Sequence, residues 1–203
     1  MNYKNHFNQT GLSIDYYNKN ADKYIDNTFN LDMNNLYEPF LKEISKGSKI
    51  LDAGCGPGRD SLYFISHGYE VTAFDGSLEF VKYATQKTGL PVMNVKFEEL
   101  DFFEEFDAIW ACASLLHIPN SSMDDVLIRL TKSLKPNGVI FVSFKYGENE
   151  EVRNGRLFND FTENKLLSLV ERHPDLSIIS SWVSPDVRND RNSEKWLNAL
   201  LRK

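Results

Sequence analysis

The sequence predicts an α/β fold: a three-layer sandwich whose middle layer is a seven-stranded, mostly parallel sheet. Two observations support this prediction. Short apolar runs alternate with amphipathic stretches, which is typical of a parallel sheet with helices on both faces. The last two runs have no helix between them, which predicts an antiparallel hairpin at the C-terminal edge of the sheet. The seven runs that we expect to form strands are residues 50–51, 69–74, 92–95, 106–113, 139–144, 176–183 and 196–201.

Helical periodicity and helix-end signals fill the stretches between these runs. Ser77 is a good N-cap for a helix that follows the second strand. The sequence Lys135-Pro136-Asn137-Gly138 ends a helix of near-ideal apolar spacing before the fifth strand. We expect polar loops at residues 146–159 and 184–194. The expected helical stretches cover residues 16–25, 36–44, 62–65, 78–84, 123–134 and 166–170.

Size and composition indicate one soluble domain. The chain has 203 residues, of which 41% are hydrophobic, and no apolar run approaches the ~20 residues that cross a bilayer. We therefore expect no membrane association and no signal peptide. A net charge of −6 argues against nucleic-acid binding. The two cysteines, Cys55 and Cys112, form no disulfide framework, which fits a reducing cytoplasm. We expect a cytoplasmic protein that is a monomer or a weak homodimer.

A glycine-rich turn follows the first strand. Gly54, Gly56 and Gly58 stand between that strand and a helix, where backbone amides face an incoming ligand. Asp52 precedes the first glycine by two residues, and Asp75 ends the next strand. Asp75 is placed to accept hydrogen bonds from both hydroxyls of a ribose. The turn therefore predicts a nucleotide-like ligand.

Two ligand classes fit such a turn, and they can be separated. A dinucleotide-dependent oxidoreductase needs Gly-x-Gly-x-x-Gly, and the third glycine is replaced here by Arg59. A pyrophosphate also gains nothing from a carboxylate at Asp52, whereas an ammonium group does. The cofactor S-adenosylmethionine ends in an amino acid and so carries that group. The oxidoreductase is thus the weaker alternative.

The motifs resemble those of a known family. Residues 51–58, Leu-Asp-Ala-Gly-Cys-Gly-Pro-Gly, look like motif I of the class I (seven-stranded, Rossmann-like) S-adenosylmethionine-dependent methyltransferases, and residues 75–77 look like motif II. Residues 106–119 resemble the motif IV region of small-molecule members, and residues 134–139 resemble the turn into the fifth strand. The resemblance covers about residues 12–203 and is strongest for the tellurite-resistance-type branch. It implies one methyltransferase domain, with a helical lid at residues 1–46 and a core at 47–203.

The resemblance also implies the cofactor site. The methionine end would be held by Asp52 and the glycine backbone, the ribose by Asp75, and the cofactor carboxylate by Arg59. Many relatives have an aspartate near the adenine, after the third strand. Lys96 stands at that position here, so that Phe97 would cover the adenine instead. The residues that we expect at the cofactor are Asp52, Gly54, Cys55, Gly56, Arg59, Asp75, Gly76, Ser77, Phe97 and Ala111.

The methyl acceptor is less defined by the sequence. His117 follows the fourth strand, where an acceptor would approach, and is the candidate general base; a packing role is the alternative. The four residues after Ala111 lack the motifs of DNA base methyltransferases. Tyr16 would lie in the lid over the cofactor. No carboxylate–histidine spacing suggests metal ligands, so we expect no metal.

Four arginines of the two late loops favour an anionic acceptor. Arg153 and Arg156 lie in the first loop, and Arg188 and Arg191 in the second. Both loops follow strands at the carboxyl edge, above the cofactor, where arginine would pair with a carboxylate or oxyanion. The same loops also hold Glu148, Glu150, Glu151, Asp186 and Asp190, so mixed solvated charge is the alternative. A non-catalytic S-adenosylmethionine-binding module also stays open, because the site predicts binding rather than turnover.

Overall fold

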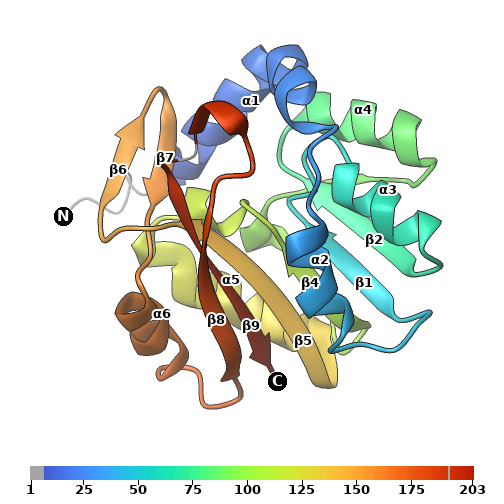
Figure 1. Ribbon diagram of the computed structural model, residues 1–203, viewed down its shortest axis with the longest axis vertical. Coiled ribbons are helices and arrows are strands. Elements are labelled where there is room, and N and C mark those ends of the chain that lie inside the picture. Colours follow the sequence, from blue (N-terminus) through green and yellow to red (C-terminus); the bar gives the residue numbers. More distant parts are fainter. Residues whose placement is uncertain (1–6, 192) are drawn as a thin grey trace.

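The computed structural model describes residues 7–191 and 193–203 and shows helices on both faces of a central sheet (Figure 1). In chain order the elements are α1 (Phe7–Thr28), α2 (Asn34–Leu41), β1 (Lys49–Ala53), α3 (Arg59–Ser66), β2 (Glu70–Asp75), α4 (Leu78–Thr88), β3 (Met93–Asn94), η1 (Phe97–Glu99), β4 (Phe106–Ala111), η2 (Leu115–His117), α5 (Asn120–Ser133), β5 (Leu134–Lys145), β6 (Glu150–Arg153), β7 (Arg156–Asn159), α6 (Glu163–Val170), β8 (Ser177–Pro185), η3 (Asn189–Arg191) and β9 (Lys195–Arg202).

The sheet has seven strands in the order β3-β2-β1-β4-β5-β9-β8. All pairs from β3 to β5 are parallel, and β9 is antiparallel to both β5 and β8. This confirms the predicted fold class, including the antiparallel edge hairpin. From β1 the chain proceeds to β2 on one side and later to β4 on the other. The crevice above β1 and β4 is therefore a topological switch point, where open α/β sheets bind ligands.

Each face of the sheet has its own hydrophobic core. On one face, Phe40 of α2 and Phe64 of α3 pack against the fully buried Trp110 of β4. On the other face, α5 and α6 contribute Val126 and Leu166. Successive residues of each central strand point to opposite faces, so both faces of these strands are apolar. The strands are thereby fixed in register, and their carboxyl ends meet at one edge.

The helices before β1 occupy two different places. α2 is part of the sandwich, whereas α1 lies across the carboxyl edge of the sheet and contacts α4 and β7 (Figure 1). α1 is kinked at Asn20, whose backbone is not helical. α1 is thus the helical lid of the predicted fold. Within the described residues, no helix has the length and apolarity needed to cross a membrane.

The expectation of an irregular loop at residues 146–159 is wrong. Residues 150–159 of this segment form an antiparallel hairpin of β6 and β7, which lies beside α1 (Figure 1). Asn154 and Gly155 make the turn with φ angles of +51° and +79°. Both central residues of a type I′ turn need positive φ, and Asn-Gly is its preferred pair. The hairpin places Arg153 and Arg156 at fixed positions instead of on a mobile loop.

Candidate functional site

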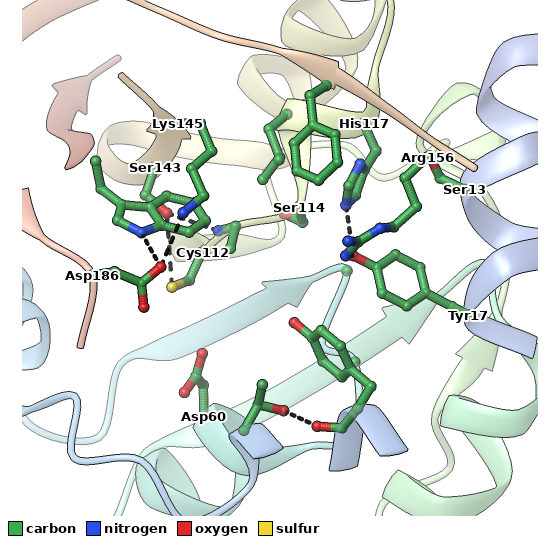
Figure 2. A pocket seen from close by; sticks show the side chains of 18 of the residues that line it. Ser13, Tyr17, Asp60, Cys112, Ser114, His117, Ser143, Lys145, Arg156 and Asp186 are labelled. Atoms are coloured by element: carbon green, nitrogen blue, oxygen red, sulfur yellow. Dashed lines mark hydrogen bonds and ion pairs between the residues drawn. The ribbon is translucent and has the colours of Figure 1, made fainter. Parts of the chain in front are cut away.

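One cavity of about 590 Å³ lies at the carboxyl ends of β1, β2, β4 and β5. α1 and the β6–β7 hairpin border it on one side, and the loop between β8 and β9 borders it on the other. Figure 2 shows the polar side chains that point into it from these elements. The volume suits a cofactor together with a small second molecule, since ligand pockets span roughly 300–1,000 Å³.

The glycine turn forms the floor of this cavity. Gly54, Gly56 and Gly58 have φ angles of +74°, +54° and +85°, a region that other residues rarely adopt. A Cβ on Gly54 would lie 2.6 Å from Cβ of Ser114, so that the turn passes directly against the segment after β4. A Cβ on Gly56 would meet nothing within 4 Å. The backbone at Gly56 is therefore open to a ligand.

Asp75 lines the cavity at the end of β2, as predicted. Its two carboxylate oxygens accept hydrogen bonds from the backbone amides of Gly56 (2.8 Å) and Ser77 (2.7 Å). Each oxygen keeps a further lone pair, because a carboxylate accepts about four hydrogen bonds. Burial raises the pKa of Asp75 to about 6, against the opposing effect of the two amides. The carboxylate is thus fixed by the glycine turn and can accept two hydroxyl groups.

Asp52 does not line the cavity. Its side chain is buried beneath the turn and accepts a hydrogen bond from Ser61 Oγ of α3 at 2.6 Å. Burial and the charge of Asp60 raise its pKa to about 8. The arrangement gives no direct path from Asp52 to a ligand ammonium. The side chain instead joins β1 to α3 below the loop.

Arg59 lines the cavity, but its charge has a partner. Its Nε donates to Asp60 at 2.6 Å, and Nη1 donates to the carbonyl oxygen of Thr28 at 3.3 Å. Asp60 also accepts hydrogen bonds from Tyr37 and Trp110. Although burial opposes it, the ion pair with Arg59 lowers the pKa of Asp60. Arg59 is thus held by a buried network at the end of the cavity that faces α1.

His117 reaches the cavity with both ring nitrogens bonded. Nδ1 lies 2.6 Å from the carbonyl oxygen of Leu157, and Nε2 lies 2.8 Å from the hydroxyl of Tyr17 (Figure 2). Burial lowers the pKa of His117 to about 4, so the ring is neutral at pH 7. A carbonyl can only accept, so Nδ1 carries the proton and Nε2 accepts from Tyr17. Neutral His117 therefore orients the Tyr17 hydroxyl.

Charged side chains at the other end of the cavity pair with each other. Asp186 accepts hydrogen bonds from Lys145 Nζ (2.9 Å), Arg188 Nη2 (2.6 Å) and Trp196 Nε1 (2.9 Å) (Figure 2). Glu194 also pairs with Lys145. Although burial raises it, these hydrogen bonds bring the pKa of Asp186 well below its usual range. This cluster is a rigid wall of the cavity whose charges are balanced.

The structure brings most of the sequence-predicted residues together, but not all. Gly76, Phe97 and Cys55 line the cavity with the residues above, and so do Arg153 and Arg156. Those of the predicted residues that lie outside the lining are Asp52, Ser77, Ala111 and Tyr16. Ser77 instead caps α4 and donates to Asn18, while Ala111 is fully buried in the sheet.

Several cavity residues were not predicted. Tyr17, rather than Tyr16, turns inward from α1, and the sequence offers no signal that separates the two neighbours. Lys145 and Asp186 were accessible to prediction, because each lies at the carboxyl end of a strand on the ligand edge. Ser114 was not marked by any motif.

Two features of this chain fit S-adenosylmethionine. Ser114 Oγ lines the cavity and is buried, with no hydrogen-bond partner in the part of the chain that the structure describes. A ligand polar atom would satisfy it. Gly76 leaves room for the lid, since a Cβ there would lie 2.8 Å from Ile14 of α1. An orphaned hydroxyl beside the glycine turn and the Asp75 acceptor matches a ligand that has both a ribose and an amino-acid end.

Comparisons with known proteins agree with this geometry. Residues 50–138, from β1 into β5, match the methyltransferase domain family. The chain is 31% identical over 106 residues to the ubiquinone biosynthesis O-methyltransferase of Rickettsia typhi. The matched stretch covers 50% of this chain and 42% of that protein. The chain therefore spans less than half the length of this curated relative.

Two solved structures share the whole fold. The 1,6-didemethyltoxoflavin-N1-methyltransferase of Burkholderia thailandensis, solved with 1,6-didemethyltoxoflavin and S-adenosylhomocysteine, has a TM-score of 0.78 and 24% identity, over 100% of this chain and 91% of that one. A TehB-like methyltransferase of Corynebacterium glutamicum has a TM-score of 0.71 and 20% identity, over 93% and 99%. With its strand order and glycine turn, the chain has the fold of the class I S-adenosylmethionine-dependent methyltransferases, and its residues 50–138 match the methyltransferase domain.

Proposed function

We propose that this protein binds S-adenosylmethionine in the cavity and transfers its methyl group to a small-molecule acceptor. The observation that carries the proposal is the pairing of Asp75 with the glycine turn. The carboxylate is fixed by the amides of Gly56 and Ser77 and still faces the cavity with free lone pairs. A turn with a purely structural role would not need a buried carboxylate whose pKa is raised to about 6.

We assign the parts of the cofactor to residues of the cavity. Asp75 accepts the ribose hydroxyls, Phe97 covers the adenine, and Ser114 Oγ and the Gly56 backbone hold the amino-acid end. Phe97 is suited to this because it lines the cavity and packs edge-on against Phe74, with ring centres 5.0 Å apart. Asp52 supports the turn from below.

The chemistry supplied by the cofactor is an electrophilic methyl group on a sulfonium. The protein needs only to hold the acceptor in line and to exclude water. The Tyr17–His117 pair serves orientation: burial raises the pKa of Tyr17 and lowers that of His117, so that both are neutral at pH 7. We therefore propose that His117 positions the acceptor through Tyr17 and does not remove its proton.

The cysteines bear on where this activity takes place. Cys55 and Cys112 are both free, which suits a reducing cytoplasm. We propose a cytoplasmic protein that works as one methyltransferase domain, as a monomer or weak homodimer. Among the described residues no group of three metal-ligating side chains is found, and the proposed chemistry involves no metal.

Turnover separates this function from a module that only binds the cofactor. The purified chain is incubated with S-adenosylmethionine and a library of small acceptors, and S-adenosylhomocysteine is measured by mass spectrometry. We expect acceptor-dependent product that Asp75→Asn abolishes, while Lys82→Gln, a change on the exposed face of α4, leaves it intact. Tight cofactor binding without product from any acceptor would favour the binding module instead.

A further inference from the structure

The charges of most cations at the cavity are neutralised by carboxylates. Arg59 pairs with Asp60, Arg153 with Asp160 and Arg188 with Asp186. Two further cations of the lining, Lys145 and Arg191, pair with Glu194. Of the four arginines that the sequence singles out, three are therefore unavailable to a ligand anion unless an ion pair breaks. In the part of the chain that the structure describes, Lys96 and Lys195 have no carboxylate partner, but both are exposed to solvent.

Arg156 differs from all of them. No carboxylate of the described residues lies within ion-pair distance of it, and its Nε is buried without a hydrogen-bond partner. Nη1 lies 3.4 Å from the hydroxyl of Tyr17, which is a long contact. The guanidinium is otherwise surrounded by aromatic rings: its carbon lies 4.5 Å from the ring centre of Tyr16 and 5.0 Å from that of Phe158. Ring faces attract a cation, but they leave its N–H donors unsatisfied.

A half-buried guanidinium with an unpaired donor is costly, because charged groups lose hydration that only a partner restores. The β6–β7 hairpin holds the backbone of Arg156 in this position, since Arg156 begins β7 immediately after the Asn-Gly turn. Arg156 also lines the same cavity as the glycine turn. An anionic oxygen of a bound ligand would satisfy the free donor and the charge together.

We infer that Arg156 binds an oxyanion of the methyl acceptor, which makes the acceptor a small organic acid. This inference rests on the proposed function and narrows its substrate class. The aromatic neighbours Tyr17 and Phe158, both in the cavity lining, favour an acid with a flat, apolar body. The neutral Tyr17 hydroxyl, oriented by His117, gives that acid a second polar contact.

The cofactor carboxylate is a less suitable partner for Arg156. With the amino-acid end held by Ser114 Oγ and the Gly56 backbone, we expect the cofactor carboxylate to turn toward Arg59, which meets Thr28 and Asp60 at the Asp60 end of the cavity. Figure 2 shows Asp60 and Arg156 on opposite sides of the pocket, with the Tyr17 ring next to Arg156. The two anions thus have separate sites.

The test uses the full chain saturated with S-adenosylhomocysteine and two flat probes of equal size, benzoate and benzamide. Calorimetry measures the affinity of each. We expect benzoate to bind about 10- to 100-fold tighter, as one charged hydrogen-bonded contact is worth ~1.5–3 kcal/mol. Arg156→Gln should remove this preference for benzoate. Arg156→Lys keeps the positive charge and should retain only part of the preference. Lys82→Gln, which removes one exposed positive charge, should change nothing.

Other outcomes overturn the inference. Equal binding of the two probes by the unmodified chain would do so, as would no binding of benzoate, or a benzoate preference that persists in Arg156→Gln. If Arg156→Gln does not fold, the intermediate preference of Arg156→Lys decides. S-adenosylhomocysteine affinity should stay within about twofold in both variants; a large loss there would assign Arg156 to the cofactor. Failure of the unmodified chain to bind S-adenosylhomocysteine would contradict the proposed function itself.

Discussion

Single carboxylates in this protein do different work because their surroundings differ. Asp52 and Asp75 each belong to one of the two sequence motifs at the carboxyl ends of β1 and β2, yet only Asp75 faces the cavity. Asp75 is held by two backbone amides, whereas Asp52 is fully buried and has one hydroxyl partner, Ser61. The pKa of Asp75 is raised to about 6 and that of Asp52 to about 8. At neutral pH the first is therefore mainly ionised, whereas burial favours the protonated form of the second.

Cofactor affinity should depend on the ionisation of Asp75. Ribose hydroxyls donate to an ionised carboxylate more strongly than to a protonated one, so binding releases a proton when Asp75 starts protonated. We expect S-adenosylhomocysteine affinity to fall as the pH drops through about 6. Calorimetry between pH 5 and pH 8 measures this, and Asp75→Asn should show weak affinity without the same pH dependence. Constant affinity of the unmodified chain across this range would contradict the role of Asp75.

The free energy of unfolding of the ligand-free protein should depend on pH through Asp52. Its folded pKa of about 8 lies above the unfolded value of 3.8, so the folded state retains a proton that the unfolded state has lost. Stability therefore falls as the pH rises from about 4 to about 8, and levels off above that. Urea unfolding at pH 6.5 and pH 9 should show this loss, and Asp52→Asn should reduce it. An equal loss in Asp52→Asn would place its origin elsewhere.

At the scale of elements, the glycine turn and the segment after β4 form one packed unit. Gly47 and Gly54 have similar φ angles, +82° and +74°, so alanine costs roughly 1–2 kcal/mol of backbone strain at each. Only at Gly54 would the new Cβ collide, at 2.6 Å from Ser114 Cβ. The close approach, and not the backbone angle alone, requires glycine there.

Alanine at the two glycines should separate strain from contact. We expect Gly54→Ala to lower the melting temperature more than Gly47→Ala, which serves as its matched control. Ser114→Gly should rescue part of the loss in the Gly54→Ala background, because the collision disappears. Calorimetric melting of these three variants beside the unmodified chain measures this. Equal losses at the two glycines, with no rescue, would contradict a packed turn.

Most of the fold could be predicted at this scale, because buried parallel strands have continuous apolar sequences. The β6–β7 hairpin was missed, since its strands have four residues each, Glu-Glu-Val-Arg and Arg-Leu-Phe-Asn, and no long apolar run marks them. Asn154-Gly155 was the available signal. Within the site, the glycine turn and Asp75 were predictable from a local motif. The inward turn of Tyr17 was not, because it depends on how α1 docks on β7 and α4.

For the whole molecule, the cavity joins parts that are far apart in sequence. α1, the β6–β7 hairpin and the β8–β9 loop all border it, and α1 contacts β7 directly. A ligand in the cavity therefore touches elements that otherwise have few contacts with the sheet. The α6 helix packs on the sheet face away from the cavity lining and takes no part in it.

Ligand binding should stabilise these bordering elements selectively. Hydrogen exchange with and without saturating S-adenosylhomocysteine is expected to show slower exchange in α1 and in the β6–β7 hairpin. Amides of α6 should change less. Protection confined to α6, or spread evenly over the chain, would contradict a ligand site beneath α1.

The central claim is that the cavity takes S-adenosylmethionine through Asp75. Calorimetric titration with S-adenosylhomocysteine, and separately with NADH, tests it most directly. The account predicts saturable one-to-one binding of S-adenosylhomocysteine, no binding of NADH, and at least about tenfold weaker S-adenosylhomocysteine binding by a folded Asp75→Asn variant. Binding of NADH instead, or S-adenosylhomocysteine affinity unchanged in Asp75→Asn, would contradict it.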